Sequence, residues 1–144
     1  MNDLTLRLLA RVRVAIDEPL DAGEVPTGRR RVIPIADGVV EGELSGAVVP
    51  LGADWNLLRA DGSETVSARY LIRTTDGVLL SVLNEGVLAD RAAGRVGVTS
   101  LRIEAPRDST YAWLNDAVLV GRLDVEEHDD GPRVVLGYWS VEPA

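Results

Sequence analysis

Two Asp-Gly pairs, at residues 61–62 and 76–77, punctuate the middle of the chain, and aliphatic and β-branched residues flank each of them. An Asp-Gly pair between such runs is the strongest short-range hairpin signal, because both residues tolerate the positive φ angles of a tight turn. We therefore predict an antiparallel meander over residues 54–86. Hairpins in series restrict the chain to an all-β architecture.

The segments before the meander also have strand character. Residues 4–16 carry an apolar side chain at every second position, with arginines and Thr5 between them, which is typical of a strand buried on one face. Residues 39–52 are apolar but interrupted by Gly42, Gly46 and Gly52. Glycines within strand-like sequence indicate bulges or bends, which allow a sheet to curl into a barrel.

Pro, Gly and Asp residues mark the boundaries of the remaining segments. Residues 17–28 are rich in Asp, Pro and Gly and are predicted to be a loop, while Pro34 and Asp37-Gly38 limit the next strand to a short piece or an edge. A short helix is possible near 109–116, and a long hairpin around the HDDGP turn closes the chain. We assign residues 1–144 to one all-β domain, a single antiparallel β-barrel of about eight to ten strands.

Composition excludes several classes of function. The 144-residue chain has no cysteine, which excludes disulfides and thiolate chemistry. Its net charge of −8 and pI near 4.6 argue against a nucleic-acid or membrane partner. The one histidine, His128, sits in the EEHDD run at the expected hairpin tip with no second histidine, so we expect a solvated turn and no metal site.

The sequence also lacks the familiar cofactor motifs. It has no phosphate-cradling glycine loop, no Rossmann fingerprint and no nucleophile elbow, so we expect no cofactor. The N-terminal segment MNDLTLRLLARVRV is charged from its third residue and has no uninterrupted apolar core, unlike a signal peptide or a spanning helix. We expect a soluble, cytoplasmic protein.

Four blocks carry a family resemblance: GRRRVIPI, GVVEGELSGAVVPLGADWNLLRADG, ARYLIRTTDGVLLSVLNEG and YAWLNDAVLVG. In order and spacing they resemble the domain of unknown function 3237 family over roughly residues 4–141. The resemblance implies a small calycin- or allene-oxide-cyclase-like β-barrel with an internal cavity and no settled general activity. The recurrent residues of the family fall on Gly28, Arg30, Pro34, Gly46, Gly52, Asp54, Trp55, Asp61, Tyr70, Asp76, Gly77, Gly86, Tyr111, Trp113, Leu114 and Asn115.

One block departs from the family pattern. Where the family tends to have an aromatic-rich run, this chain has GRVGVTSLRIEAP at residues 94–106. The loss of those rings would enlarge or reshape the cavity, so the chain need not share a substrate with its relatives.

Asp54 and Trp55 have two interpretations. In the structural one, Trp55 plugs one end of the barrel and Asp54 caps a turn. In the functional one, Trp55 packs on an apolar ligand and Asp54 acts in the cavity as an acid or base, because a carboxylate in a dry pocket has a raised pKa. The two interpretations predict different surroundings for the carboxylate.

Three further aromatic residues are candidates for ligand contact. In TYAWLND, residues 110–116, Tyr111, Trp113 and Asn115 would share one face if the segment were a strand, and they would offer ring surface and an amide. Tyr70 would line the cavity if its strand faces inward at that position. Structural packing is the alternative for all of them.

Several charged and polar residues also have both a structural and a functional interpretation. Arg30, the family position in the Arg29–Arg31 run, is predicted to pair with Asp54 or to hold a ligand anion, while Arg29 and Arg31 are expected to be solvated. Asn84 and Glu85 are expected to form a turn, although they could line a rim.

We therefore expect a cofactor-independent enzyme that acts on a mostly apolar small molecule inside the barrel. The expected reaction is a cyclisation, isomerisation or addition–elimination, with Asp54 as acid or base and Arg30 as anion stabiliser. The expected cavity wall comprises Trp55, Tyr70, Tyr111, Trp113 and Asn115. One alternative is a non-catalytic carrier of a hydrophobic ligand, and another is a filled barrel with a structural role; a homo-oligomer is possible in each case.

Overall fold

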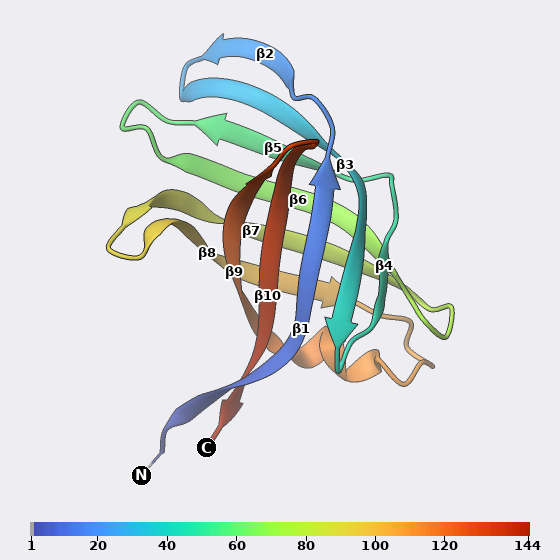
Figure 1. Ribbon diagram of the computed structural model, residues 1–144. Helices are drawn as coiled ribbons and strands as arrows, with labels where there is room; N and C mark the ends of the chain where they lie inside the picture. Colours follow the sequence, from blue (N-terminus) through green and yellow to red (C-terminus); the bar gives the residue numbers. More distant parts are fainter. Residues whose placement is uncertain (1) are drawn as a thin grey trace.

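The computed structural model describes residues 2–144, which form ten strands and one short 3₁₀ helix (Figure 1). The elements are β1 (Leu4–Ile16), β2 (Leu20–Val25), β3 (Gly28–Gly42), β4 (Gly46–Val48), β5 (Ala53–Leu58), β6 (Glu64–Thr74), β7 (Leu79–Arg91), β8 (Gly94–Glu104), η1 (Ala112–Asp116), β9 (Val118–His128) and β10 (Gly131–Pro143).

The strands close into an antiparallel barrel, which confirms the predicted fold class. The sheet runs in the order β1-β10-β9-β8-β7-β6-β4-β3, and pairing of β1 with β3 completes the circle. Strands β4 and β5 occupy one position in succession, because both pair with β3 on one side and with β6 on the other. Strand β2 pairs with β3 alone, so the result is an eight-stranded barrel with two extra strands.

The tight turns predicted at the two Asp-Gly pairs are confirmed. Gly62 and Gly77 adopt φ angles of 86° and 88° in the turns that connect β5 to β6 and β6 to β7. The long C-terminal hairpin is β9–β10, in which His128 pairs with Gly131 across the HDDGP turn. Local hairpins therefore account for half of the barrel.

Two predictions about the first half of the chain are wrong. Residues 17–28, predicted to be a loop, contain β2, which pairs with the start of β3. Strand β3 does not stop at Asp37-Gly38 but runs through it, since a register shift opposite Ala15 and Ile16 absorbs one residue as a bulge.

The alternation in β1 also changes face along the strand. A register shift between Leu8 and Ala10 makes Leu9 a bulge residue that is buried, and Ala10, Val12 and Val14 then point into the core. The earlier leucines, Leu4, Leu6 and Leu8, are exposed. Only the second half of the predicted half-buried strand therefore contributes to the core.

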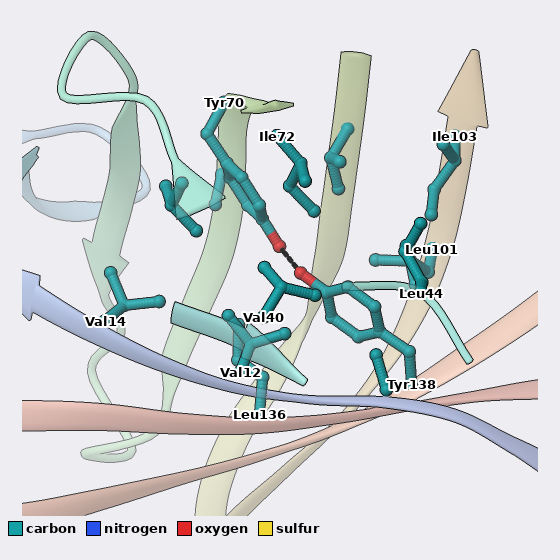
Figure 2. Close-up of a cluster of buried hydrophobic side chains, with 14 of the residues drawn as sticks. Val12, Val14, Val40, Leu44, Tyr70, Ile72, Leu101, Ile103, Leu136 and Tyr138 are labelled. Atoms are coloured by element: carbon teal, nitrogen blue, oxygen red, sulfur yellow. Dashed lines mark hydrogen bonds between the residues drawn. The ribbon is translucent and has the colours of Figure 1, made fainter. Parts of the chain in front are cut away.

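The core is one cluster of buried side chains inside the barrel. In Figure 2, Tyr70 and Tyr138 point toward one another from opposite walls, among aliphatic side chains that include Val12, Ile72 and Leu101. The helix η1 lies at the end of the barrel where the chain termini emerge, and its Leu114 is buried in the same cluster (Figure 1). The short helix expected near 109–116 is thus confirmed, and it closes this end.

Helical structure is otherwise sparse. Within residues 2–144, no helix has the length and apolar character required to cross a bilayer.

Substitution of Gly52 by alanine should destabilise the barrel. A Cβ at Gly52 would lie 2.2 Å from the backbone oxygen of Arg69 and 2.7 Å from the Cβ of Tyr70. Neither atom can retreat without moving β6, so we expect Gly52→Ala to cost about 1–3 kcal/mol in a urea denaturation experiment.

Gly97→Ala is the matched control. The nearest atom to a Cβ at Gly97 is 3.4 Å away, which is ordinary contact, so this variant should be neutral or stabilised by up to about 1 kcal/mol. Equal effects of the two substitutions would contradict the close approach of Gly52 to β6.

Candidate functional site

Part of the barrel interior is not filled by side chains. A cavity of about 110 Å³ lies among side chains of β1, β3, β4, β5, β6, β7, β9 and β10. Most of its lining is aliphatic, and the polar members are Asp54, Asn56, Glu64, Tyr70 and Asn84. Val125, another lining residue, is 45% exposed, so the cavity reaches solvent near the β9–β10 turn.

Strand register explains how these polar side chains meet. Asp54 of β5 lies opposite Ala68 of β6, and Ala68 lies opposite Asn84 of β7. Residues that are paired across an antiparallel sheet project from the same face, so Asp54 and Asn84 both point inward with only the methyl group of Ala68 between them. Across these three strands, a polar side chain therefore lies on each side of the small, apolar Ala68.

Asp54 is a carboxylate in mostly apolar surroundings. Burial raises the pKa of Asp54, and the nearby charge of Glu64 acts in the same direction. The backbone N–H of Ser67 donates to Oδ1 of Asp54 at 2.8 Å, which together with Asn56 and the charge of Arg31 partly opposes the shift. No arginine of the described chain forms an ion pair with Asp54, so its charge is not neutralised by a direct partner.

A charged cluster sits beside Asp54. Nη2 of Arg31 donates to Oε1 of Glu64 at 2.7 Å and to Oδ1 of Asn56 at 2.9 Å, and Nδ2 of Asn56 donates to Oε1 of Glu64 at 3.0 Å. Nη2 of Arg95 donates to the other Glu64 oxygen at 2.7 Å. Glu64 thus links β3 and β8 to β6, and its charge is compensated by two arginines.

A pair of tyrosines lies beside the cavity, and Tyr70 is the member that lines it. The hydroxyl groups of Tyr70 and Tyr138 are hydrogen-bonded to one another, and both side chains are buried (Figure 2). Burial raises the pKa of Tyr70 to about 12, although hydrogen bonds with Tyr138 and Asn84 partly offset the shift. Burial also raises the pKa of Tyr138 well above its ordinary value. Both phenols are therefore neutral at physiological pH.

Of the predicted site residues, Asp54 and Tyr70 line the cavity. Trp55 does not: it is 52% exposed and lies on the outer face, because its neighbours Asp54 and Asn56 point inward. Arg30 does not line the cavity either, because Ile33 of the same strand lines it and residues three apart on a strand project from opposite faces. Nη1 of Arg30 donates to the backbone oxygen of Trp55 at 2.8 Å.

The TYAWLND residues lie at the opposite end of the barrel and do not line the cavity. The segment is helical, so the shared face expected for a strand does not form. The Tyr111 hydroxyl donates to Oδ1 of Asp76 at 2.7 Å, and the ring of Trp113 lies 5.4 Å from the guanidinium of Arg7. The Asn115 side chain bonds both backbone groups of Ala105 and clamps the chain that leads into η1.

Three cavity residues were not predicted as site residues: Asn56, Glu64 and Asn84. The bonds of Arg31 to Asn56 and Glu64 were not predicted either. Period two from Asp54 puts Asn56 on the same face, and period two from Tyr70 puts Glu64 there, so both could have been found. Asn84, expected in a turn, lies within β7, and its inward position depends on the pairing with Ala68.

No metal-binding cluster was found: within residues 2–144, no three His, Asp or Glu side chains lie close enough together to hold an ion. His128 is exposed at the end of β9, with Nε2 at 3.2 Å from Oε1 of Glu126.

The fold and the cavity define a class of protein: small antiparallel β-barrels with an internal, mostly apolar cavity that carries a few polar groups. Within this class, residues 4–141 match the model of the family described as protein of unknown function DUF3237, and the chain belongs to that family. The predicted resemblance is thus confirmed.

The curated relatives are UPF0311 proteins. A UPF0311 protein of Rhodopseudomonas palustris strain TIE-1 is 40% identical over 77 residues, and one from Clostridium acetobutylicum is 38% identical over 78 residues. The matched part is 53% of this chain, and it spans about half the length of these relatives, 50% and 49% respectively.

Solved structures share the barrel over almost all of its length. A conserved protein of unknown function from Rhodopseudomonas palustris has a TM-score of 0.85 at 30% identity and covers 96% of this chain and 98% of its own. A β-barrel-like protein from Acinetobacter baumannii reaches 0.87 at 26% identity, with 97% of each chain covered. A protein described as an enzyme from Penicillium herquei scores 0.74 at 19% identity, with 96% and 95% covered, which shows the fold alone.

Replacement of Asp54 by asparagine should stabilise the protein at neutral pH. Because the pKa of Asp54 is higher in the folded than in the unfolded chain, the folded state loses stability as pH rises from the ordinary aspartate pKa through the raised one. Asparagine keeps an acceptor for the Ser67 N–H without the charge. We expect a thermal midpoint a few degrees above wild type at pH 7, with the difference shrinking as pH falls toward 4.

Asp37→Asn is the control, because Asp37 is exposed and its carboxylate has no hydrogen-bond partner within the described chain. Its thermal midpoint at pH 7 should equal that of wild type. A lower midpoint for Asp54→Asn at pH 7 would mean that the surroundings of Asp54 favour its ionised form.

Proposed function

We propose that this protein is a cofactor-independent enzyme that transfers a proton on a small, mostly apolar molecule bound in the barrel. Asp54 is the acid or base. The observation that carries this proposal is an unpaired carboxyl with a raised pKa in a largely aliphatic cavity. Carboxyl groups in such surroundings are suited to general acid–base catalysis near neutral pH.

Proton transfer is the step that the expected reactions share. A cyclisation, an isomerisation or an addition–elimination each requires a proton to leave one atom and another to be delivered nearby. Ionised Asp54 accepts a proton from a carbon next to a carbonyl, and the resulting carboxylic acid returns it to a different atom of the bound molecule. The Ser67 N–H fixes the carboxyl group for both steps.

The composition favours this chemistry over covalent catalysis. The chain contains no cysteine, and all of its basic residues other than His128 are arginines, so neither a thiolate nor a lysine Schiff base is available. Arg30 is left out of the mechanism because it contacts the Trp55 carbonyl on the outer face. Arg31 is engaged by Glu64 and Asn56 and acts instead through its charge near Asp54.

The cavity limits the size of the molecule. A cavity of about 150 Å³ in another protein holds benzene, so about 110 Å³ with an open end suits a single ring or a branched chain of similar size. The Penicillium herquei neighbour, described as an enzyme, supports catalysis on this fold without identifying the reaction.

Exchange of carbon-bound hydrogen tests the proposal without knowledge of the natural substrate. Wild-type protein in D₂O should accelerate deuterium incorporation next to the carbonyl of single-ring ketones such as cyclohexanone and cyclohexane-1,3-dione, as followed by proton NMR. Asp54→Asn should lower the catalysed rate by about 10²–10⁴-fold. The wild-type rate should rise with pH through the raised pKa of Asp54 and then level off.

Asp37→Asn again serves as the matched control and should exchange at the wild-type rate. If ketones bind but wild type and Asp54→Asn exchange them equally, Asp54 is not the base. If bound ketones do not exchange at all, the protein is a carrier of small apolar molecules, with Asp54 and its neighbours as recognition groups.

A further inference from the structure

The first residues of β1 lie outside the closed part of the barrel. Residues 4–8 pair with β10 on one side, whereas β3 joins the other side of β1 only from Ala10 onward. Figure 1 shows β1 and β10 leaving the barrel together, beyond the end of β3. Within the described chain, one edge of β1 therefore keeps unpaired backbone N–H and C=O groups over residues 4–8.

This open edge carries an apolar surface. Leu4, Leu6 and Leu8 project from the same face of the strand and are 72%, 58% and 45% exposed. Strand pairing extends this surface, because Leu6 lies opposite Val141 of β10, and Val141 lies opposite Val118 of β9, which is 64% exposed. A strand edge that is both open and apolar readily pairs with another strand.

The opposite face of residues 4–8 is already occupied. Arg7 projects from this face and forms ion pairs with Glu43 and Glu142. Its guanidinium also lies over the ring of Trp113 in η1. Because the charge of Arg7 is compensated within one copy of the chain, a strand added to this edge has no unpaired charge to neutralise.

The segment LTLRL, residues 4–8, is self-complementary as an antiparallel strand. When two copies pair around a two-fold axis at Leu6, Leu6 lies opposite itself and Leu4 lies opposite Leu8 of the second copy. All three leucines then face leucines on one side of the extended sheet. On the other side Arg7 faces Thr5 of the second copy, so the two arginines are not directly opposite one another.

We propose that a second copy of this chain covers the apolar surface, through antiparallel pairing of the two β1 strands centred on Leu6. Strands β9, β10 and β1 of both copies then form one six-stranded sheet, which shields the leucines from water. The symmetric spacing of the leucines favours an identical strand over a foreign one. This inference goes beyond the proposed function and does not depend on it.

Sedimentation of the wild-type protein at increasing concentration tests the proposal. The contact involves five residues of each β1 strand, which places it among small interfaces, so we expect a reversible dimer with a dissociation constant of about 1–100 μM. Leu6→Lys should weaken this dimer at least about 30-fold, because two ammonium groups would meet across the axis. Leu6 is exposed, so the variant should keep the thermal midpoint of wild type.

Leu51→Lys is the matched control for this substitution. Leu51 is 74% exposed and lies between β4 and β5, so lysine there changes the net charge equally without touching β1. Its dimer should dissociate at the wild-type concentration.

Engineered thiols test the register, because the chain contains no cysteine. Leu6→Cys should form an intermolecular disulfide under mild oxidation, since residues directly opposite in an antiparallel pair have Cα atoms about 4.5–5.5 Å apart. Leu4→Cys is the control: its two thiols would lie about 14 Å apart along the pair and should stay reduced. A mixture of the Leu4→Cys and Leu8→Cys proteins should cross-link, because these positions face one another.

Three results would overturn the inference. The first is a wild-type protein that stays monomeric up to about 500 μM, well above the expected dissociation constant. The second is a dimer that Leu6→Lys leaves intact, which would place the contact on another surface. The third is disulfide formation in Leu4→Cys as fast as in Leu6→Cys, which would reject the register centred on Leu6.

Discussion

Closure of the sheet is the constraint on which the rest of the structure depends. Pairing of β1 with β3 removes the free edges of the main sheet and directs alternate residues of every barrel strand inward. An interior made in this way excludes water from any polar group that the alternation places there. Each inward polar residue must then be compensated, as Glu64 is by two arginines, or remain costly, as Asp54 and Asn84 do.

The uncompensated polar groups are not spread evenly through the barrel interior. Around Tyr138 and Leu114 the interior is filled with aliphatic side chains, and the Tyr138 hydroxyl is hydrogen-bonded to Tyr70, so this region stabilises the fold. On the other side of Tyr70 the lining retains a void, a charged carboxyl and an unpaired amide oxygen. Burial of uncompensated groups beside a void sacrifices stability, which is a common feature of active sites.

Sequence reasoning predicted the elements whose causes are local. Asp-Gly turns, the HDDGP hairpin and the all-β class depend on backbone preferences of a few adjacent residues. The bulges in β1 and β3 were not predictable, because they arise from register with strands distant in the chain. The same bulges decide which leucines of β1 are buried.

Individual site residues such as Asp54 and Tyr70 were predicted correctly. The errors concern the face of the strand from which a side chain projects. Asp54 and Tyr70 line the cavity, but Trp55 and Arg30 lie one residue out of phase with it, and strict alternation already excludes Asp54 and Trp55 from sharing a face. Tyr111, Trp113 and Asn115 were misplaced because a strand was assumed where a 3₁₀ turn forms.

The outward position of Trp55 has a practical optical consequence. Trp113 and Trp139 also lie outside the cavity lining, where arginines stack on their rings, so the aromatic side chain that meets the cavity is a tyrosine. Indole emission therefore reports on the solvent-facing shell of the molecule and is nearly blind to the interior. Binding of a ligand in the cavity therefore has to be followed by the spectrum of the ligand itself or by tyrosine absorbance.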